Sequence, residues 1–154
     1  MPLPPAPALD AGSYILVDYQ TGDVLAQKNA DERLPMASLT KLMTAYIVFA
    51  ALKDGRLTLT EPVTISKAAW QTGGSRMFVK VGSEVPVLDL IEGMLVQSGN
   101  DATVALAEKV GGTQAGFVQM MNTYAQRLGL KSTHYDDADG LPQPTHYTTA
   151  RDLA

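Results

Sequence analysis

The sequence contains no cysteine and only two histidines, His134 and His146, among its 154 residues. Without cysteine the chain cannot form disulfides, cysteine-rich metal sites or a thiol nucleophile. The separation of the two histidines matches no common zinc motif. We therefore expect neither a metal ion nor another cofactor, and we expect both histidines at the surface.

Basic residues are scarce as well. Lysine and arginine together number 12 against 16 aspartates and glutamates, which gives a net charge of −4. No run of basic residues stands out, so nucleic acid is not an expected partner. Hydrophobic residues make up 45% of the chain, which is enough apolar material for the core of one domain.

Long hydrophobic runs are also missing. The longest, at residues 42–52, is too short to cross a bilayer and predicts a buried helix instead. The opening segment MPLPPAPALDAG has neither the basic nor the apolar stretch of a signal peptide. We predict a flexible lead-in rich in proline and alanine over 1–12, followed by a single domain over 13–154.

Hydrophobic periodicity predicts a mixture of short strands and helices. Residues 14–18 and 23–27 are predicted to form a hairpin, with Gly22 in its turn. The segment 39–53 is predicted to be a helix that buries Leu39, Leu42, Met43, Tyr46, Ile47 and Ala50. The remaining predictions are a strand at 62–65, a one-turn helix at 66–70 capped by Ser66, an extended segment at 76–81, helices at 87–97, 101–110 and 114–128, and a loop at 131–147.

The first candidate for chemistry is Ser38 followed by Lys41, in the stretch MASLTKLMTAY. Three positions along a helix place two side chains on one face. A serine hydroxyl needs a neighbouring base to become a strong nucleophile, and lysine can be that base when apolar burial lowers its pKa. The alternative is structural, with Ser38 capping the helix and Lys41 on its surface. The burial is expected from Met36, Leu39, Leu42 and Met43.

The second candidate is Ser98-Gly99-Asn100, a polar break between two apolar helices. Side chains at such a break can point into a cleft. Ser98 can pass a proton there, and Asn100 offers both a donor and an acceptor to a substrate amide and to the lysine. The alternative is that Asn100 or Asp101 only caps the helix that follows.

The two candidates together form a more specific pattern than either alone. Ser-x-x-Lys at the head of an apolar helix, then Ser-x-Asn some 60 residues later, is typical of the penicillin-recognising serine enzymes. The chain resembles the D-alanyl-D-alanine carboxypeptidases, the low-molecular-mass penicillin-binding proteins, over nearly everything from residue 13 onward. Matching stretches include YILVDYQTGDVLAQKNADERLPMASLTKLMTAY, GSRMFVKVGSEVPVLDLIEGMLVQSGNDA and YTTARDLA. Class A β-lactamases usually carry Ser-Asp-Asn at the second motif, so Ser-Gly-Asn favours the carboxypeptidases.

The resemblance implies a fold and a reaction. The fold is α/β (α+β), with helices packed on an antiparallel sheet. Ser38 would attack the carbonyl of the penultimate D-alanine of a peptidoglycan stem peptide, and β-lactam antibiotics would acylate the same serine. Lys41 would be the general base, Ser98 would relay protons, and Asn100 would hold the substrate and orient Lys41. The full-length protein would be periplasmic and associated with the membrane.

The family's third motif, Lys-Thr-Gly, is not present in this sequence. The string QTGG at 71–74 lacks the lysine and precedes the second motif, so we do not accept it as a substitute. Thr149 and Asp152 have the spacing of a capping box, but the helix they announce would have a single turn, which is too short to be stable alone. We therefore expect an N-terminal part of a catalytic domain, incomplete at its C-terminus.

This expectation leaves several functions open. The first is a serine DD-carboxypeptidase, and the alternatives are a catalytically dead fragment with an assembly or wall-binding role, a β-lactamase-like hydrolase and a DD-endopeptidase. If the chain folds, we expect it to depend on a complementary fragment or a twin chain that exchanges elements with it. We expect Trp70 and the methionines in the core and Asp139 as a solvated loop residue.

Overall fold

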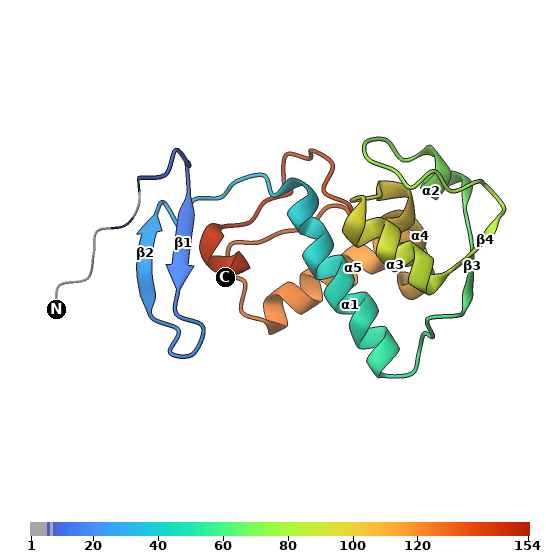
Figure 1. Ribbon diagram of the computed structural model, residues 1–154, viewed down its shortest axis with the longest axis horizontal. Helices are drawn as coiled ribbons and strands as arrows, with labels where there is room; N and C mark the ends of the chain where they lie inside the picture. Colours follow the sequence, from blue (N-terminus) through green and yellow to red (C-terminus); the bar gives the residue numbers. More distant parts are fainter. Residues whose placement is uncertain (1–5, 7) are drawn as a thin grey trace.

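The computed structural model describes residue 6 and residues 8–154, so half of the predicted lead-in lies outside the described residues (Figure 1). A hairpin of β1 (Tyr14–Val17) and β2 (Val24–Lys28) lies at one end, apart from a body of packed helices. A second two-stranded antiparallel sheet lies at the opposite end of that body. The predicted class, helices combined with antiparallel sheet, is confirmed.

The N-terminal hairpin was predicted from two short apolar segments and the turn between them, and it is confirmed. Tyr14 pairs with Lys28 in an antiparallel register. Asp18 closes the turn because its Oδ1 accepts from the backbone N–H groups of Gln20 and Thr21. Gly22 has a φ of +76°, the conformation that favours glycine.

The helix predicted over 39–53 is present, but its first turn is tighter than an α-helix. A 3-10 helix, η1 (Ala37–Thr40), leads into α1 (Lys41–Lys53). The predicted buried face is partly wrong, since Leu39, Leu42 and Tyr46 are 51%, 57% and 49% exposed. This helix is apolar on nearly all sides, so periodicity alone could not fix which side faces the core. The residues it buries are Lys41, Met43, Thr44, Ala45, Ile47, Val48 and Ala51.

Helix α4 (Asn100–Gly111) forms the centre of the helical body. It packs against α1, α2 (Lys67–Gln71), α3 (Val87–Val96) and α5 (Gln114–Arg127). A helix enclosed on several sides must be apolar all round, and every residue over 101–107 is buried. The three helices predicted in this region are confirmed to within one residue at each end.

The segment before α3 contains a short helix and a short pair of strands. The predicted capped one-turn helix is confirmed as α2, since Ser66 Oγ accepts from the N–H of Ala69. The strand β3 (Pro62–Thr64) pairs with β4 (Glu84–Pro86). The segment 76–80, predicted to be extended, belongs to no sheet, and the Asp101 carboxylate accepts from the N–H groups of Met77 and Val79 at 2.9 and 3.2 Å.

The core consists of two apolar clusters, and α1 contributes to both. One cluster lies among α3, α4 and the sheet of β3 and β4, and the other lies around α5 and the loop that follows it. Four methionines are buried as predicted, namely Met36, Met43, Met94 and Met121. Trp70 is 44% exposed, so its predicted place in the core was wrong.

The segment 131–147 is a loop, as predicted, and isolated bridges connect it and the two residues that follow to the body. His134 pairs with Tyr147, and Leu34 pairs with Thr148. It leads into the single turn of α6 (Ala150–Leu153), whose first amides are capped when Thr149 Oγ1 accepts from the N–H of Asp152. The Asp152 carboxylate binds Ser132 N and Thr133 Oγ1 instead of completing the predicted capping box. No helix among the described residues has the length and apolar character needed to cross a membrane.

Candidate active site

Ser38, Lys41 and Ser98 meet at the start of α1. Lys41 Nζ lies 3.1 Å from Ser38 Oγ, and Ser98 Oγ lies 2.9 Å from the same oxygen. Ser38 and Ser98 are 60 positions apart in the chain, so the fold and not the local sequence brings them together. One hydroxyl oxygen therefore has an amine on one side and a second hydroxyl on the other.

The amine of Lys41 is buried and has three partners. Lys41 as a whole residue is only 4% exposed. Besides Ser38 Oγ, Nζ lies 2.7 Å from Oδ1 of Asn100 and 2.8 Å from the carbonyl oxygen of Asp139. The amide oxygen and the carbonyl can only accept. A neutral amine has two hydrogens to give to them, which leaves its lone pair for the hydrogen of Ser38.

The environment of Lys41 acts in two directions on its charge. Burial lowers the pKa of Lys41 from its ordinary value, while the nearby carboxylates of Asp139 and Asp137 act against that change. The net direction is downward, as a general base requires. The predicted apolar surroundings are partly wrong, because Met36 and Met43 are buried whereas Leu39 and Leu42 point outward.

The backbone before Ser38 is unusual for the residue it contains. Ala37 has a φ of +46°, in a left-handed region that alanine rarely occupies. The 3-10 turn that follows carries Ser38 on the side of the chain where Lys41 lies. Neither η1 nor α1 has a side-chain cap, so the structural alternative in which Ser38 caps the helix is wrong.

The second motif is held by its backbone and by a close contact. Ser98 has a φ of +54°, and a Cβ built on Gly99 would lie 3.0 Å from the Gly93 carbonyl oxygen. The Asn100 N–H donates to the Ser75 carbonyl at 2.7 Å. Its side-chain amide donates to Gly73 O at 2.8 Å, which turns Oδ1 toward Lys41. Gly99 is the N-cap residue of α4, and no side chain caps this helix, so the capping alternative for Asn100 and Asp101 is wrong.

Asp139 was expected to be solvated, and this expectation is wrong. The residue is 4% exposed, and its carbonyl is one of the three partners of Lys41. Burial is the main cause that raises the pKa of its carboxyl to about 6, with the Asp137 carboxylate second. The acidic stretch DDADG gives no sign of burial in the sequence, because the burial comes from packing of the loop against α1.

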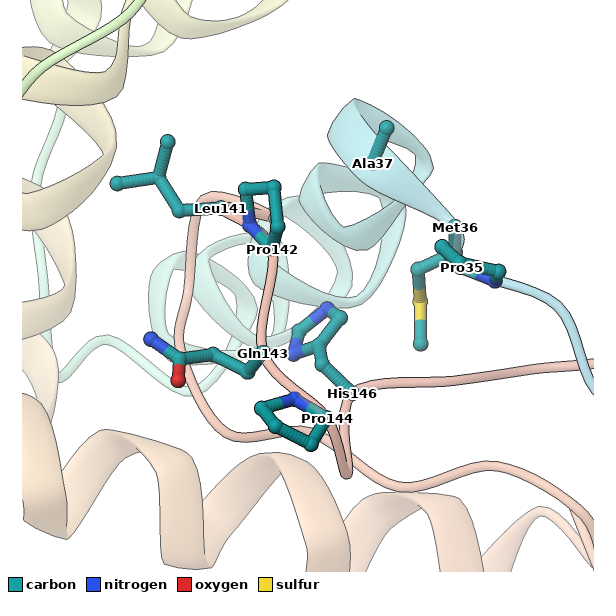
Figure 2. A pocket seen from close by; sticks show the side chains of 9 residues that line it. Pro35, Met36, Ala37, Leu141, Pro142, Gln143, Pro144 and His146 are labelled. Carbon is teal, nitrogen blue, oxygen red and sulfur yellow. The ribbon is translucent and has the colours of Figure 1, made fainter.

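His146 was expected at the surface, and this expectation is also wrong. The residue is 4% exposed, and its Nε2 lies 2.7 Å from Thr40 Oγ1. Figure 2 shows its ring rising from the loop toward the first turns of η1 and α1. The adjacent cavity of about 350 Å³ is lined mainly by this loop and the segment 35–37. None of the four predicted site residues lines this cavity.

Comparison with known proteins gives consistent results. A family model described as D-alanyl-D-alanine carboxypeptidase matches residues 3–154. The D-alanyl-D-alanine carboxypeptidase DacC of Escherichia coli is 50% identical over 155 residues, which cover 97% of this chain and 39% of that protein. The chain thus spans less than half the length of this relative.

Two solved structures are similar throughout the chain. The D-alanyl-D-alanine carboxypeptidase DacD from Francisella tularensis has a TM-score of 0.94 and 48% identity, covering 99% of this chain and 37% of that one. Penicillin binding protein 5 from Haemophilus influenzae also has a TM-score of 0.94, with 45% identity and coverage of 97% and 44%.

Proposed function

The chain belongs to the D-alanyl-D-alanine carboxypeptidase family, and from this premise we propose that its site performs the acyl transfer of a serine DD-carboxypeptidase. The substrate would be a peptidoglycan stem peptide ending in D-Ala-D-Ala, and β-lactam antibiotics would acylate the same serine. The observation that carries the proposal is the buried Lys41 amine 3.1 Å from Ser38 Oγ, with its other two partners restricted to accepting.

In the proposed reaction Lys41 takes the proton of Ser38 while Oγ bonds to the carbonyl carbon of the penultimate D-alanine. The carbonyl oxygen becomes an oxyanion, and the Ser38 backbone N–H would be one donor to it. When the C–N bond breaks, the proton passes from Lys41 through Ser98 to the amine of the departing D-alanine. Water then gives a proton to Lys41 as it attacks the ester carbonyl. The bond from that carbon to Ser38 Oγ breaks, and Oγ takes the proton from Lys41, which restores the Ser38 hydroxyl and releases the shortened peptide.

Asn100 has two roles in this proposal. Its Oδ1 fixes the position of the Lys41 amine. Its side-chain amide donates one hydrogen to Gly73 O, and the other hydrogen would donate to the substrate. We further propose that the full-length protein works at the periplasmic face of the membrane, where its substrate is found.

We also propose that a second polypeptide segment covers part of α1 next to the site. Leu39, Leu42, Tyr46 and Phe49 form an exposed apolar face, and they are 47–57% exposed. Their spacing follows one side of a helix, and the first of them adjoins Ser38. An apolar face of this kind is typical of an interaction surface. The occupant would be a complementary fragment or a twin chain that exchanges elements with this one, and these are the two outcomes that the test separates.

The proposed function is tested by incubating the chain and its Ser38→Ala variant with a peptide ending in D-Ala-D-Ala. Release of one D-alanine by the unsubstituted chain, and none by Ser38→Ala, would support a carboxypeptidase. Cleavage of a cross-linked dimer without release of terminal D-alanine would indicate the endopeptidase, and rapid hydrolysis of a β-lactam without D-alanine release would indicate a β-lactamase-like enzyme. A folded chain without any of these activities would be the catalytically dead fragment.

A further inference from the structure

A continuous series of hydrogen bonds connects a buried histidine to the residue before Ser38. The N–H of Asp136 donates to Nδ1 of His146 at 3.0 Å, so Nδ1 carries a lone pair and the ring proton lies on Nε2. Nε2 then donates to Thr40 Oγ1 at 2.7 Å, and Thr40 Oγ1 donates to the Ala37 carbonyl at 2.7 Å. Each donor and acceptor in the series is used in a consistent direction.

We propose that His146 is a positioning residue for Ser38, which through Thr40 holds the Ala37 carbonyl and thereby fixes the backbone turn that presents the serine hydroxyl to Lys41. This inference rests on the proposed function, because it assigns His146 a role in the acyl transfer at Ser38. His146 contacts no reacting atom in this account, and it acts only through Thr40.

The turn needs such support because it is strained at Ala37. A left-handed φ is unfavourable for a non-glycine residue, and Ala37 has a φ of +46°. Its carbonyl is also enclosed from the other side, since a Cβ built on Gly140 would overlap it. The carbonyl is thus held between Thr40 and the loop that carries His146, and neither Thr40 nor His146 is accessible to solvent.

The series depends on a neutral His146. A second proton on Nδ1 would face the N–H of Asp136, so one hydrogen bond would become a repulsive contact between two donors. Burial lowers the pKa of His146 from its ordinary value of 6.5. Asp137, whose Oδ1 lies 3.9 Å from Nδ1, and Asp136 favour the charged ring, whereas His134 disfavours it. Tyr135 presents only a ring edge, and Thr40 on the α1 side is uncharged.

The series therefore predicts a loss of acylation at acid pH. As the pH falls through the lowered pKa of His146, the ring gains a proton and the hold on Ala37 is released. A glutamine at this position can still donate to Thr40 from its amide but cannot titrate. A leucine cannot titrate either, and it cannot donate a hydrogen bond. Comparing the two substitutions therefore separates the effect of the hydrogen bond from the effect of side-chain volume.

The experiment compares penicillin acylation rates of His146→Gln, His146→Leu and a His134→Leu control between pH 5 and 8. His134 is the other histidine of the same loop, and its side chain is 45% exposed. We expect His146→Leu to acylate about tenfold more slowly, as loss of a buried hydrogen-bond partner predicts. His146→Gln should stay within about threefold at pH 7.5 and show a smaller acid decline, since only the part due to protonation of Lys41 remains, and His134→Leu should match the unsubstituted chain at pH 7.5. Equal slowing by Gln and Leu, or an unchanged acid decline in His146→Gln, would overturn the proposal.

A second readout keeps this test independent of the proposed function. The backbone amide resonance of Ser38, followed by NMR, should shift with pH in step with the His146 ring and should not do so in His146→Gln. If the chain is never acylated but the Ser38 amide shift changes with the protonation of His146, the proposed function fails and the positioning role of His146 is supported. If the Ser38 amide shift does not change with the protonation of His146, the positioning role is overturned, whatever the acylation result.

Discussion

The amine of Lys41 in the first turn of α1 lies 2.8 Å from the backbone carbonyl oxygen of Asp139, which is 98 positions away in the chain. This contact and the one to Asn100 direct the two hydrogens of a neutral amine away from Ser38. A lone pair then faces the serine hydroxyl, so the loop helps to make Lys41 a base.

Replacing Lys41 with methionine tests that role, because methionine is an unbranched side chain only one atom shorter and has no amine. We expect acylation by penicillin to slow by at least about 100-fold, the usual contribution of a positioned general base. The measurement is the acylation rate constant, with the melting temperature recorded in parallel. A well-folded Lys41→Met variant that acylates at the original rate would rule out Lys41 as the base.

Replacing Asp139 with asparagine should shift the pH dependence of acylation toward lower pH. The pKa of Asp139 is raised to about 6, so its carboxylate is charged above that pH and favours the ammonium form of Lys41. Without this negative charge Lys41 should lose its proton at lower pH. Since the backbone carbonyl remains, the contact to Nζ is kept. The control is Asp54→Asn at the exposed end of α1, which should leave the profile in place, and a shift toward higher pH in Asp139→Asn would contradict the account.

Gly140→Ala should be more destabilising than Gly112→Ala, although both residues have a positive φ. A Cβ at position 140 meets the Ala37 carbonyl and Thr40 Oγ1, whereas a Cβ at position 112 meets nothing within 4 Å. We expect a loss of about 1 kcal/mol at Gly112 from strain alone and at least about 2 kcal/mol at Gly140 from strain and overpacking together.

Denaturant unfolding measures both free energies. Gly140→Ala should in addition slow acylation, because it displaces the turn that carries Ser38. Equal losses of stability in the two variants would show that the loop does not enclose Ala37 as described.

The exposed apolar face of α1 predicts self-association that depends on concentration. Leu42 and Phe49 lie in this face, and a Leu42→Lys, Phe49→Lys double variant should be largely monomeric at concentrations where the unsubstituted chain forms dimers. Val96→Lys is the matched control, since Val96 is 82% exposed but lies outside the face. Sedimentation velocity gives the mass of the species, and a chain that is monomeric at all concentrations, with a cooperative melt, would contradict a twin partner.

Residues that are close in the sequence were the easiest to predict. The hairpin, the Ser66 cap and the helices follow from periodicity and from turn residues. The buried side of α1 could not be predicted in the same way, because a helix that is apolar on nearly all sides has more than one side that could face the core. The four site residues were found from two short motifs, and the structure brings them together, while their catalytic roles stay a prediction.

Asp139 and His146 could not be placed from the sequence. Both are polar residues in a loop with prolines, and such residues are usually exposed. Their burial arises from long-range contacts of that loop with Thr40, Lys41 and Thr44 of η1 and α1. The contact of Asp101 with the amides of Met77 and Val79 is likewise long-range, and nothing in the sequence pattern indicates it.

The most direct test of the account is the intact mass of the chain after exposure to penicillin G, with Ser38→Ala as the control. We predict that the unsubstituted chain gains the mass of one penicillin, that the adduct maps to the peptide containing Ser38, and that the alanine variant gains nothing. A folded chain that gains no adduct, or an adduct that persists in Ser38→Ala, would contradict the proposal that Lys41 activates Ser38 as a nucleophile.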